Sequence, residues 1–422
     1  VSCSDQLELY PETNLTEGNY YNTEDELLLA ANDVYRQLCR LYDANGIPDL
    51  YGERFSDNAC VIFTDGANSY TEDIVLHQIK SDNGTILTAW RTAYNAISII
   101  NDILDRLENT SVSFSSDELL NRIKAEALFV RSLIYYNLIQ AFGDVPFPLK
   151  VVSVSESYSY LREDKKEIYS HIISDLLSCK EHLPEVYQGK DIGRITTYAA
   201  SSILAKIYLT IGEKDLAKIE LKRIVDSGKY SLDSNNDGVV DVKDYEYLFL
   251  PDTKNCRESI LEIQYLSGVD NVNAQHQNQY TPFLWSFHLP GSSETFRGGG
   301  KNTPSKDLIS EYEENDPRKE ISIIFGYQDE GANIWVDHPY TNKFYDPNWQ
   351  NPGQNFEIIR YADILLLYSE VTGDASYLNQ VRARVGLSPF GSDLYPKNYN
   401  TLALAVEHER SCLLYTSDAA DE

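Results

Sequence analysis

The sequence contains no methionine and no run of eighteen or more apolar residues. A helix that spans a bilayer needs about 20 predominantly apolar residues, so the sequence predicts no membrane-spanning helix. Basic residues are scarce as well, since 36 lysines and arginines stand against 65 aspartates and glutamates, for a net charge of −29. Such a chain is repelled by a phosphate backbone, and nucleic acid is therefore not an expected partner.

Familiar catalytic motifs and metal-binding motifs built from cysteine or histidine are also missing. The six cysteines include no Cys-x-x-Cys pair, the seven histidines include no His-Glu-x-x-His, and there is no Gly-x-Ser-x-Gly elbow. Residues 298–302 resemble a phosphate-binding loop, but Thr295 and Asn302 replace its first Gly and its final Ser or Thr, so a flexible turn is predicted. We therefore expect no disulfide framework, no zinc site, no organic cofactor and no enzymatic activity.

The sequence does contain clear helical patterns. Apolar residues make up 42% of the chain, which is enough for a sizeable core. The clearest pattern predicts a helix from Glu118 to Phe142. Ser115 and Glu118 form the sequence of a capping box, while Gly143 and Pro146 supply a left-handed stop and a block to continuation. Apolar side chains cover most of its circumference, so this helix is predicted to be buried between others.

Apolar residues at helical spacing predict further helices. They cover about residues 27–41, 86–107, 165–183, 196–211, 214–227 and 361–370. Residues 198–212 and 215–225 together resemble a tetratricopeptide unit, because small residues in the first helix and Gly212 at its end allow close packing. A short β-like run, 356–359, precedes the last helix. The predicted fold class is mainly α.

Four segments together carry a resemblance to a known family. Residues 125–146 read Ala-Glu-Ala, then Arg131, a Tyr-Tyr pair and Phe-Gly-Asp-Val-Pro, and three further segments follow in order at 304–318, 359–370 and 378–387. This series resembles the SusD/RagB family of nutrient-binding outer-membrane lipoproteins. The resemblance implies a mainly α fold, in which a tetratricopeptide-like superhelix of helical pairs carries an inserted loop-rich irregular region.

The resemblance also implies a function and a cellular location. Members capture oligosaccharides or other nutrients for import through a SusC-like TonB-dependent transporter, as in the polysaccharide-utilisation systems of Bacteroidetes. Cys3 would be the lipidated residue that anchors the protein to the outer membrane and leaves it exposed at the cell surface; a plain thiol is the alternative interpretation. Two other functions stay open, a tetratricopeptide-type protein-interaction adaptor and a helical-scaffold glycoside hydrolase that uses two of the many carboxylates.

The chain divides into five predicted segments. They are a lipid-anchor tether at 1–14, the N-terminal part of the helical scaffold at 15–231, an irregular ligand-binding region at 232–355, C-terminal scaffold helices at 356–410, and a final segment at 411–422. This final segment departs from the family pattern after Arg410 and resembles translated adapter sequence. We expect it to be a sequence artefact, with the natural C-terminal part missing.

A twelve-position pattern in residues 233–244 is typical of a calcium-binding loop. The expected ligands are Asp233, Asn235, Asp237, the backbone carbonyl of Val239, Asp241 and Asp244. Gly238 would allow the sharp turn, and Asp244 replaces the usual Glu at the last position. The alternative is a surface turn rich in Asp and Asn that needs no ion. A bound Ca²⁺ would have a structural role.

An oligosaccharide site needs aromatic rings on which sugar rings stack, together with polar neighbours for the hydroxyl groups. The densest aromatic run lies in the irregular region and contains Tyr280, Phe283 and Trp285, and the same region contains Trp335 and Trp349 beside Asn and Asp residues. Polar partners are expected from the variable stretch 49–82. They are Asp57, Asp65, Asn68 and Tyr70. Each Trp could instead fill a local core beneath a loop.

Overall fold

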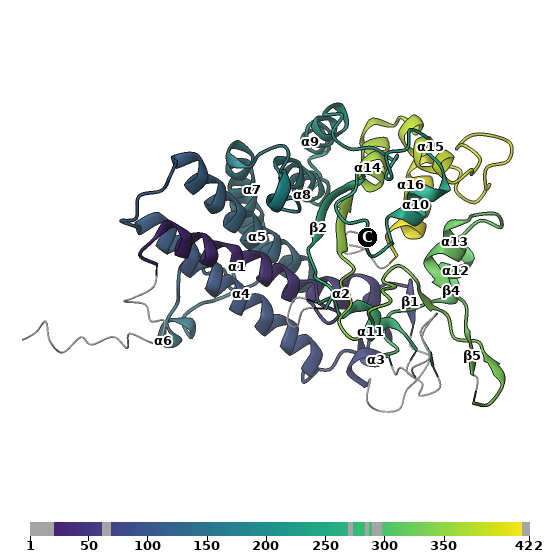
Figure 1. The fold of residues 1–422 in the computed structure, drawn as a ribbon, viewed down its shortest axis with the longest axis horizontal. Helices are drawn as coiled ribbons and strands as arrows, with labels where there is room; N and C mark the ends of the chain where they lie inside the picture. The colour runs from purple at the N-terminus through teal and green to yellow at the C-terminus, as the bar shows by residue number, and fades with distance from the viewer. Residues whose placement is uncertain are drawn as a thin grey trace, which may run out of the picture.

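The structure is a computed structural model that describes residues 21–60, 69–268, 273–282, 287–288, 298–329 and 331–415. Helices dominate it (Figure 1). The longer ones are α1 Glu24–Leu41, α4 Gly84–Asn109, α5 Asp117–Phe142, α7 Lys165–His182, α8 Thr197–Thr210, α9 Lys214–Asp226, α14 Tyr361–Thr372, α15 Ala375–Arg384 and α16 Leu402–Leu414. The shorter ones are α2 Ile47–Tyr51, α3 Ser69–Val75, α6 Val154–Ser157, α10 Val242–Tyr247, α11 His276–Tyr280, α12 Lys306–Glu311 and α13 Arg318–Ser322.

Successive long helices pack against one another. Contacts run from α4 to α5, then to α7, α8 and α9, and α9 in turn packs against α14. This stacking of consecutive helices is the arrangement expected of helical pairs that bury a continuous core between them. The predicted fold class, mainly α with a tetratricopeptide-like scaffold, is confirmed.

The central helix α5 is buried as predicted, but its N-cap lies one residue later than expected. Ser116 is the N-cap, and its side chain accepts a hydrogen bond from the backbone N–H of Leu119, so no capping box forms. Ser115 instead donates through its Oγ to Glu24 at the start of α1, 2.9 Å away. At the other end, Gly143 adopts φ 68° and stops the helix.

Four small antiparallel sheets, each of two strands, occur in the described residues. The pairs are β1 Ala59–Cys60 with β3 Thr303–Pro304, β2 Ser259–Ile263 with β8 Phe356–Arg360, β4 Ile323–Ile324 with β7 Tyr340–Thr341, and β5 Tyr327–Asp329 with β6 Ile334–Val336. Between residues 232 and 355 the described helices have at most six residues, so short strands and loops organise this region.

Two large apolar clusters form the core, one among α1, α4, α5, α7 and α8, the other among α14, α15 and α16. A buried ion-pair triad joins them. Asp363 on α14 lies 3.3 Å from Lys206 on α8 and 3.0 Å from Arg410 on α16. Because all three groups are withdrawn from solvent, each charge depends on the others for compensation, which fixes the relative position of the three helices.

The sequence departs from the family pattern after Arg410, but no helix ends at that residue in the structure. Helix α16 continues to Leu414, and Cys412, Leu413 and Tyr415 are buried. The buried ammonium group of Lys343 donates to the backbone carbonyls of Leu413 and Tyr415. Residues 416–422 lie outside the described part of the chain, and the predicted origin of segment 411–422 stays a prediction, as do the other segment boundaries.

Among the described residues, no helix combines the length and the apolar character that crossing a bilayer requires, in agreement with the sequence.

Candidate functional site

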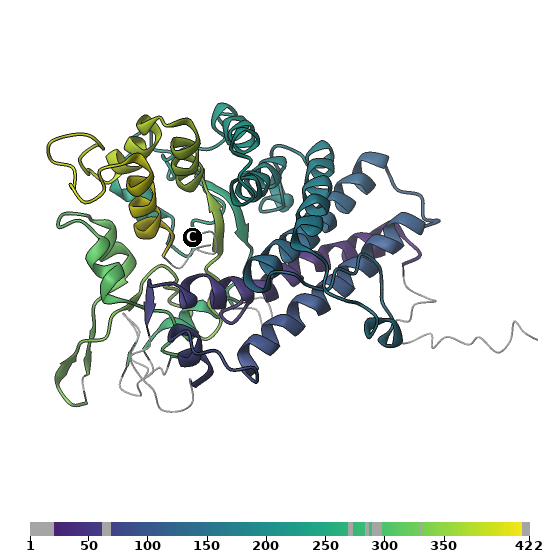
Figure 2. The same cartoon turned by 180° about the vertical axis from the view of Figure 1, so that it is seen from behind.

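The irregular region gathers at one end of the molecule's long axis. Both views place α3, α11 and the β5–β6 hairpin along the same lower edge, with the hairpin outermost (Figures 1 and 2). The helical body holds this edge in place, because β2 and β8 pack into the main apolar cluster. Loops carried on a rigid scaffold are where binding groups concentrate, so this edge is the candidate ligand site.

Among the aromatic residues that the sequence singled out and whose side chains the structure describes, Trp335 is the most exposed. It lies on β6, opposite Gln328 of β5, and 60% of its surface is accessible. Gly326 lies beneath the indole, since a Cβ added to this glycine would come within 2.6 Å of the Trp335 ring. The glycine therefore leaves room for the ring to approach the backbone closely. A flat, accessible indole on a short hairpin is a suitable platform for a sugar ring.

The hairpin rests on a small aromatic cluster of Phe287, Tyr327 and Tyr340, all buried. The Phe287 ring meets those of Tyr327 and Tyr340 edge to face, with centroids 5.0 and 5.3 Å apart. Trp349 packs against this cluster and is half-buried. Trp349 thus supports the surface that carries Trp335, and only part of it is available to a ligand.

The prediction that Tyr280 forms part of the aromatic platform is wrong. It is only 2% exposed, because its ring packs against His276 and Phe344. Its hydroxyl donates a 2.6 Å hydrogen bond to Asp49, which also forms an ion pair with the buried Arg54. Burial, followed by the charge of Asp49, raises the pKa of Tyr280 well above its ordinary value. Tyr280 therefore fastens the loop from inside and offers no free face to a ligand.

Asp57 is exposed, and the remaining predicted glycan residues have side chains that the structure does not describe. Phe283, Trp285, Asp65 and Asn68 lie outside the described residues, and Tyr70 lies in α3 with its side chain undescribed. Their role stays a prediction.

Two side-chain contacts near this edge were not predicted from the sequence. The rings of Phe55 and His77 stack with centroids 4.4 Å apart, and His77 Nε2 lies 2.8 Å from the Phe55 carbonyl oxygen. Lys301 donates to Asn45 at 2.8 Å, and burial, with the nearby charge of Arg54, lowers the pKa of Lys301 to about 8. Each pair is far apart in the sequence, so no local pattern could have revealed it.

The glycine run before Lys301 packs closely against the backbone of residues 278–282, which explains why these positions are glycines. The N–H groups of Gly298, Gly299 and Gly300 donate to backbone carbonyls in 278–282, and a Cβ on Gly298 would lie 2.2 Å from Thr281. The run is needed for close backbone approach, which replaces the predicted flexible turn.

The predicted calcium loop folds around its own acidic side chains. Asp233 accepts from the N–H groups of Asp237 and Gly238, and Asp244 accepts from those of Asn235 and Asp241. Asp244 is fully buried, and Gly238 takes φ 88° as the turn requires. The side chain at position twelve thus accepts a hydrogen bond from the backbone at position three and closes the loop. In this loop, which the structure describes in full, no three carboxylates have oxygens within 4.8 Å of one another.

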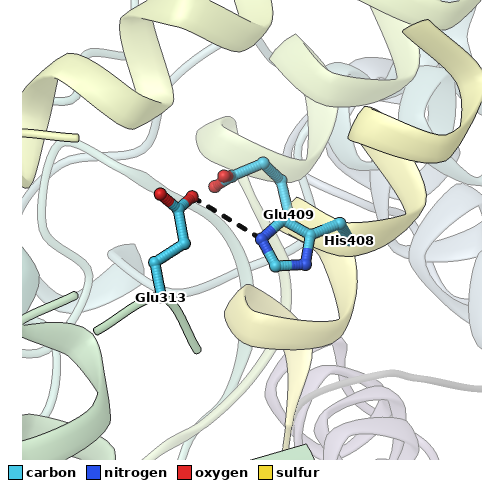
Figure 3. Close-up of side chains that lie close together, drawn as sticks. All are labelled: Glu313, His408 and Glu409. Atoms are coloured by element: carbon cyan, nitrogen blue, oxygen red, sulfur yellow. Dashed lines mark ion pairs between the residues drawn. The ribbon is translucent and has the colours of Figure 1, made fainter. Parts of the chain in front are cut away.

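One group of potential metal ligands does lie close together in the described residues: Glu313, His408 and Glu409, with ligand atoms within 4.8 Å (Figure 3). Arginines already neutralise it. Arg382 pairs with both Glu313, at 2.8 Å, and Glu409, and Arg318 lies 2.7 Å from Glu409. A guanidinium between the two carboxylates repels a cation. We interpret the group as an ion-pair network that fastens the chain after α12 to α15 and α16.

The protonation states agree with this interpretation. Burial opposes ionisation of Glu313, but hydrogen bonds with His408 and Arg382 prevail and lower its pKa to about 2. Burial likewise disfavours the imidazolium, but hydrogen bonds with Glu313 and Glu311 raise the pKa of His408. Both shifts favour the charged pair.

Comparison with known proteins shows which proteins this chain is similar to. A family described as "Starch-binding associating with outer membrane" matches residues 25–209. SusD-like protein P2 of Formosa agariphila is 23% identical, over 94% of this chain and 81% of that relative. A SusD-like protein of Bacteroides ovatus is 24% identical, over 90% of this chain and 71% of that relative.

Solved structures agree over nearly the whole chain. A laminarin-binding SusD-like protein superimposes with a TM-score of 0.77 at 24% identity, covering 93% of this chain and 89% of the other. Surface glycan-binding protein A of Bacteroides thetaiotaomicron, in complex with laminarihexaose, gives a TM-score of 0.76 at 18% identity, covering 94% and 89%. At these identities the similarity establishes the fold.

Proposed function

Since this chain belongs to the SusD/RagB family, we propose that it is a surface glycan-binding protein that captures oligosaccharides for import through a SusC-like TonB-dependent transporter. The observation that carries the proposal is Trp335, a flat indole left 60% exposed on a hairpin at the loop-rich edge. Stacking on such a ring, with hydrogen bonds from neighbouring polar groups, holds a sugar without making or breaking a bond.

Lipid attachment at Cys3 and exposure at the cell surface are further parts of this proposal. The family description supports association with the outer membrane. A lipid on Cys3 would keep the binding edge close to the transporter, and a single anchor with a protein partner is enough for stable attachment.

Affinity electrophoresis and calorimetry test the proposal with the purified chain. Because one structural neighbour is a laminarin-binding protein and another is in complex with laminarihexaose, laminarin is the first probe, followed by a panel of other polysaccharides. We expect retarded migration with at least one glycan and no release of reducing sugar. Absence of binding to the whole panel, or turnover that a carboxylate substitution abolishes, would contradict it.

We also propose that residues 233–244 bind Ca²⁺ as a structural ion. The supporting features are the matching ligand positions, the positive φ of Gly238 and the closure of the loop through Asp244. Side-chain oxygens of Asp233, Asn235, Asp237 and Asp241, the carbonyl of Val239 and Asp244 would hold the ion, which would replace part of the present hydrogen bonding inside the loop.

A further inference from the structure

A short arm that follows α5 and its Pro-containing turn has an apolar surface that the fold does not use. We define the arm as residues 150–166, which include α6. Val154, Tyr158 and Leu161 are 77%, 86% and 84% exposed, and Val151 beside them is exposed as well. Large apolar side chains exposed singly are ordinary, but four within eleven consecutive residues form a patch that calls for a partner.

The charges of the arm differ from those of the rest of the molecule. It has four exposed basic residues, Lys150, Arg162, Lys165 and Lys166, against three acidic ones, Glu156, Glu163 and Asp164. The whole chain has a net charge of −29. Arg162, Lys165 and Lys166 form no ion pair with any other residue that the structure describes. Glu167, the next residue, is also exposed and makes this balance neutral, so an anionic surface would repel the arm less than the rest of the protein, and Arg162, Lys165 and Lys166 would be its contacts.

The arm lies beside the point at which the described chain begins. Val151 and Tyr21 line the same groove between α1 and α4, and the Arg106 guanidinium lies 4.1 Å above the Tyr21 ring. In both views α6 and the start of α1 occupy one end of the long axis, while the hairpin with Trp335 occupies the other (Figures 1 and 2). The residues from Cys3 to Tyr21, even fully extended, span at most about 65 Å, so a lipid on Cys3 would keep the arm near a membrane.

We propose that this arm contacts the lipid surface of the outer membrane, with Val154, Tyr158 and Leu161 in the headgroup region and the flanking basic residues on anionic groups. Exposed apolar side chains flanked by Lys and Arg are the features of interfacial binding. The contact would hold one end of the long axis at the lipid surface. This inference rests on the outer-membrane location proposed above.

Vesicle flotation with the unlipidated chain tests the arm by itself. Vesicles of phosphatidylethanolamine with phosphatidylglycerol should bind the wild-type chain, and V154S/Y158S/L161S should bind at least about tenfold more weakly. Lys165→Glu with Lys166→Glu should weaken binding to these vesicles but not to vesicles of phosphatidylcholine alone.

A matched control is L216S/I219S, which removes two exposed apolar side chains from α9 and should bind vesicles like the wild type. V154S/Y158S/L161S and L216S/I219S should both keep the wild-type melting temperature and glycan affinity, because the substituted side chains are exposed and far from the ligand edge. The inference is overturned if the wild-type chain does not float with vesicles, or if V154S/Y158S/L161S floats as well as the wild type. A chain that binds vesicles but no glycan would count against the proposed function alone.

Discussion

Arg318 donates a 2.7 Å hydrogen bond to Glu409, and both side chains are withdrawn from solvent although 91 residues separate them. Glu409 also pairs with Arg382, so one carboxylate compensates two buried guanidinium groups. Arg318 has a second partner in Asp316 at 2.7 Å. The network therefore ties the irregular region to the C-terminal helices through charges that have no access to water.

Removal of this central carboxylate should be strongly destabilising. Glu409→Gln leaves Arg318 and Arg382 with too little negative charge, and we expect a loss of about 3–5 kcal/mol in the free energy of unfolding. Urea denaturation followed by circular dichroism measures it. Glu407→Gln is the matched control, since Glu407 lies on the same helix but is exposed. Equal stability of the two variants would contradict the prediction.

The same network predicts that the free energy of unfolding depends on pH in both the acidic and the alkaline range. The pKa of Glu313 falls from 4.5 to about 2 on folding, so its contribution is present above about pH 4.5 and is lost as the pH falls toward 2. The pKa of His408 is raised above 6.5, so its contribution is full below pH 6.5 and is lost as the pH rises through the folded value.

Thermal unfolding across this pH range measures both effects. Glu313→Gln should flatten the acidic limb, and His408→Gln should flatten the alkaline limb, because each removes one titrating group. An unchanged alkaline limb in His408→Gln would show that another group is responsible.

The end of α5 offers a test of backbone strain alone. Gly143 has φ 68° and ψ −128°, a conformation that residues with a Cβ avoid, and a Cβ placed there would meet no atom within 4 Å. Gly143→Ala should therefore cost about 1–3 kcal/mol through strain without any clash. Chemical denaturation compares it with Gly331→Ala, whose φ is not positive. A neutral Gly143→Ala would mean that the helix ends differently in solution.

Trp335 should matter for affinity and Trp349 chiefly for stability. Trp335→Ala removes the exposed platform, and we expect a glycan affinity roughly 3- to 10-fold lower with an unchanged melting temperature. Trp349→Ala should lower the melting temperature, because this ring packs on the buried aromatic cluster. Calorimetric titration and thermal unfolding separate the two effects, and Tyr158→Ala, an exposed aromatic residue on the arm, is the control. Unaltered affinity in Trp335→Ala would place the site elsewhere.

Calcium should stabilise the folded chain by mass action. At a free Ca²⁺ concentration 100 times the dissociation constant, the free energy of unfolding should rise by about 2.7 kcal/mol. A chelator should remove this stabilisation. Asp237→Asn keeps an oxygen that can accept from the Val239 N–H but removes one charge. We expect this variant to lose calcium affinity while its stability in chelator equals that of the wild type. A wild-type melting temperature that does not respond to chelator would contradict the calcium proposal.

The sequence by itself determined the helices, because apolar spacing, caps and stop residues act within a few positions of one another. The burial of α5, the pairing of α8 with α9 and the closure of the loop at Asp233 all belong to this class. Even there, the choice between Ser115 and Ser116 as the cap depended on Glu24 of another helix.

Only the tertiary structure decided which aromatic side chains face solvent. Tyr280 and Trp335 occur in similar loop sequence, yet Tyr280 is fixed in the core by Asp49, 231 positions away, whereas Trp335 is left accessible over Gly326. The stacking of His77 on Phe55 and the neutralisation of Glu409 by two arginines likewise depend on distant segments. Local pattern sets the backbone of each element, but exposure and charge compensation are set by whichever segments the fold brings together.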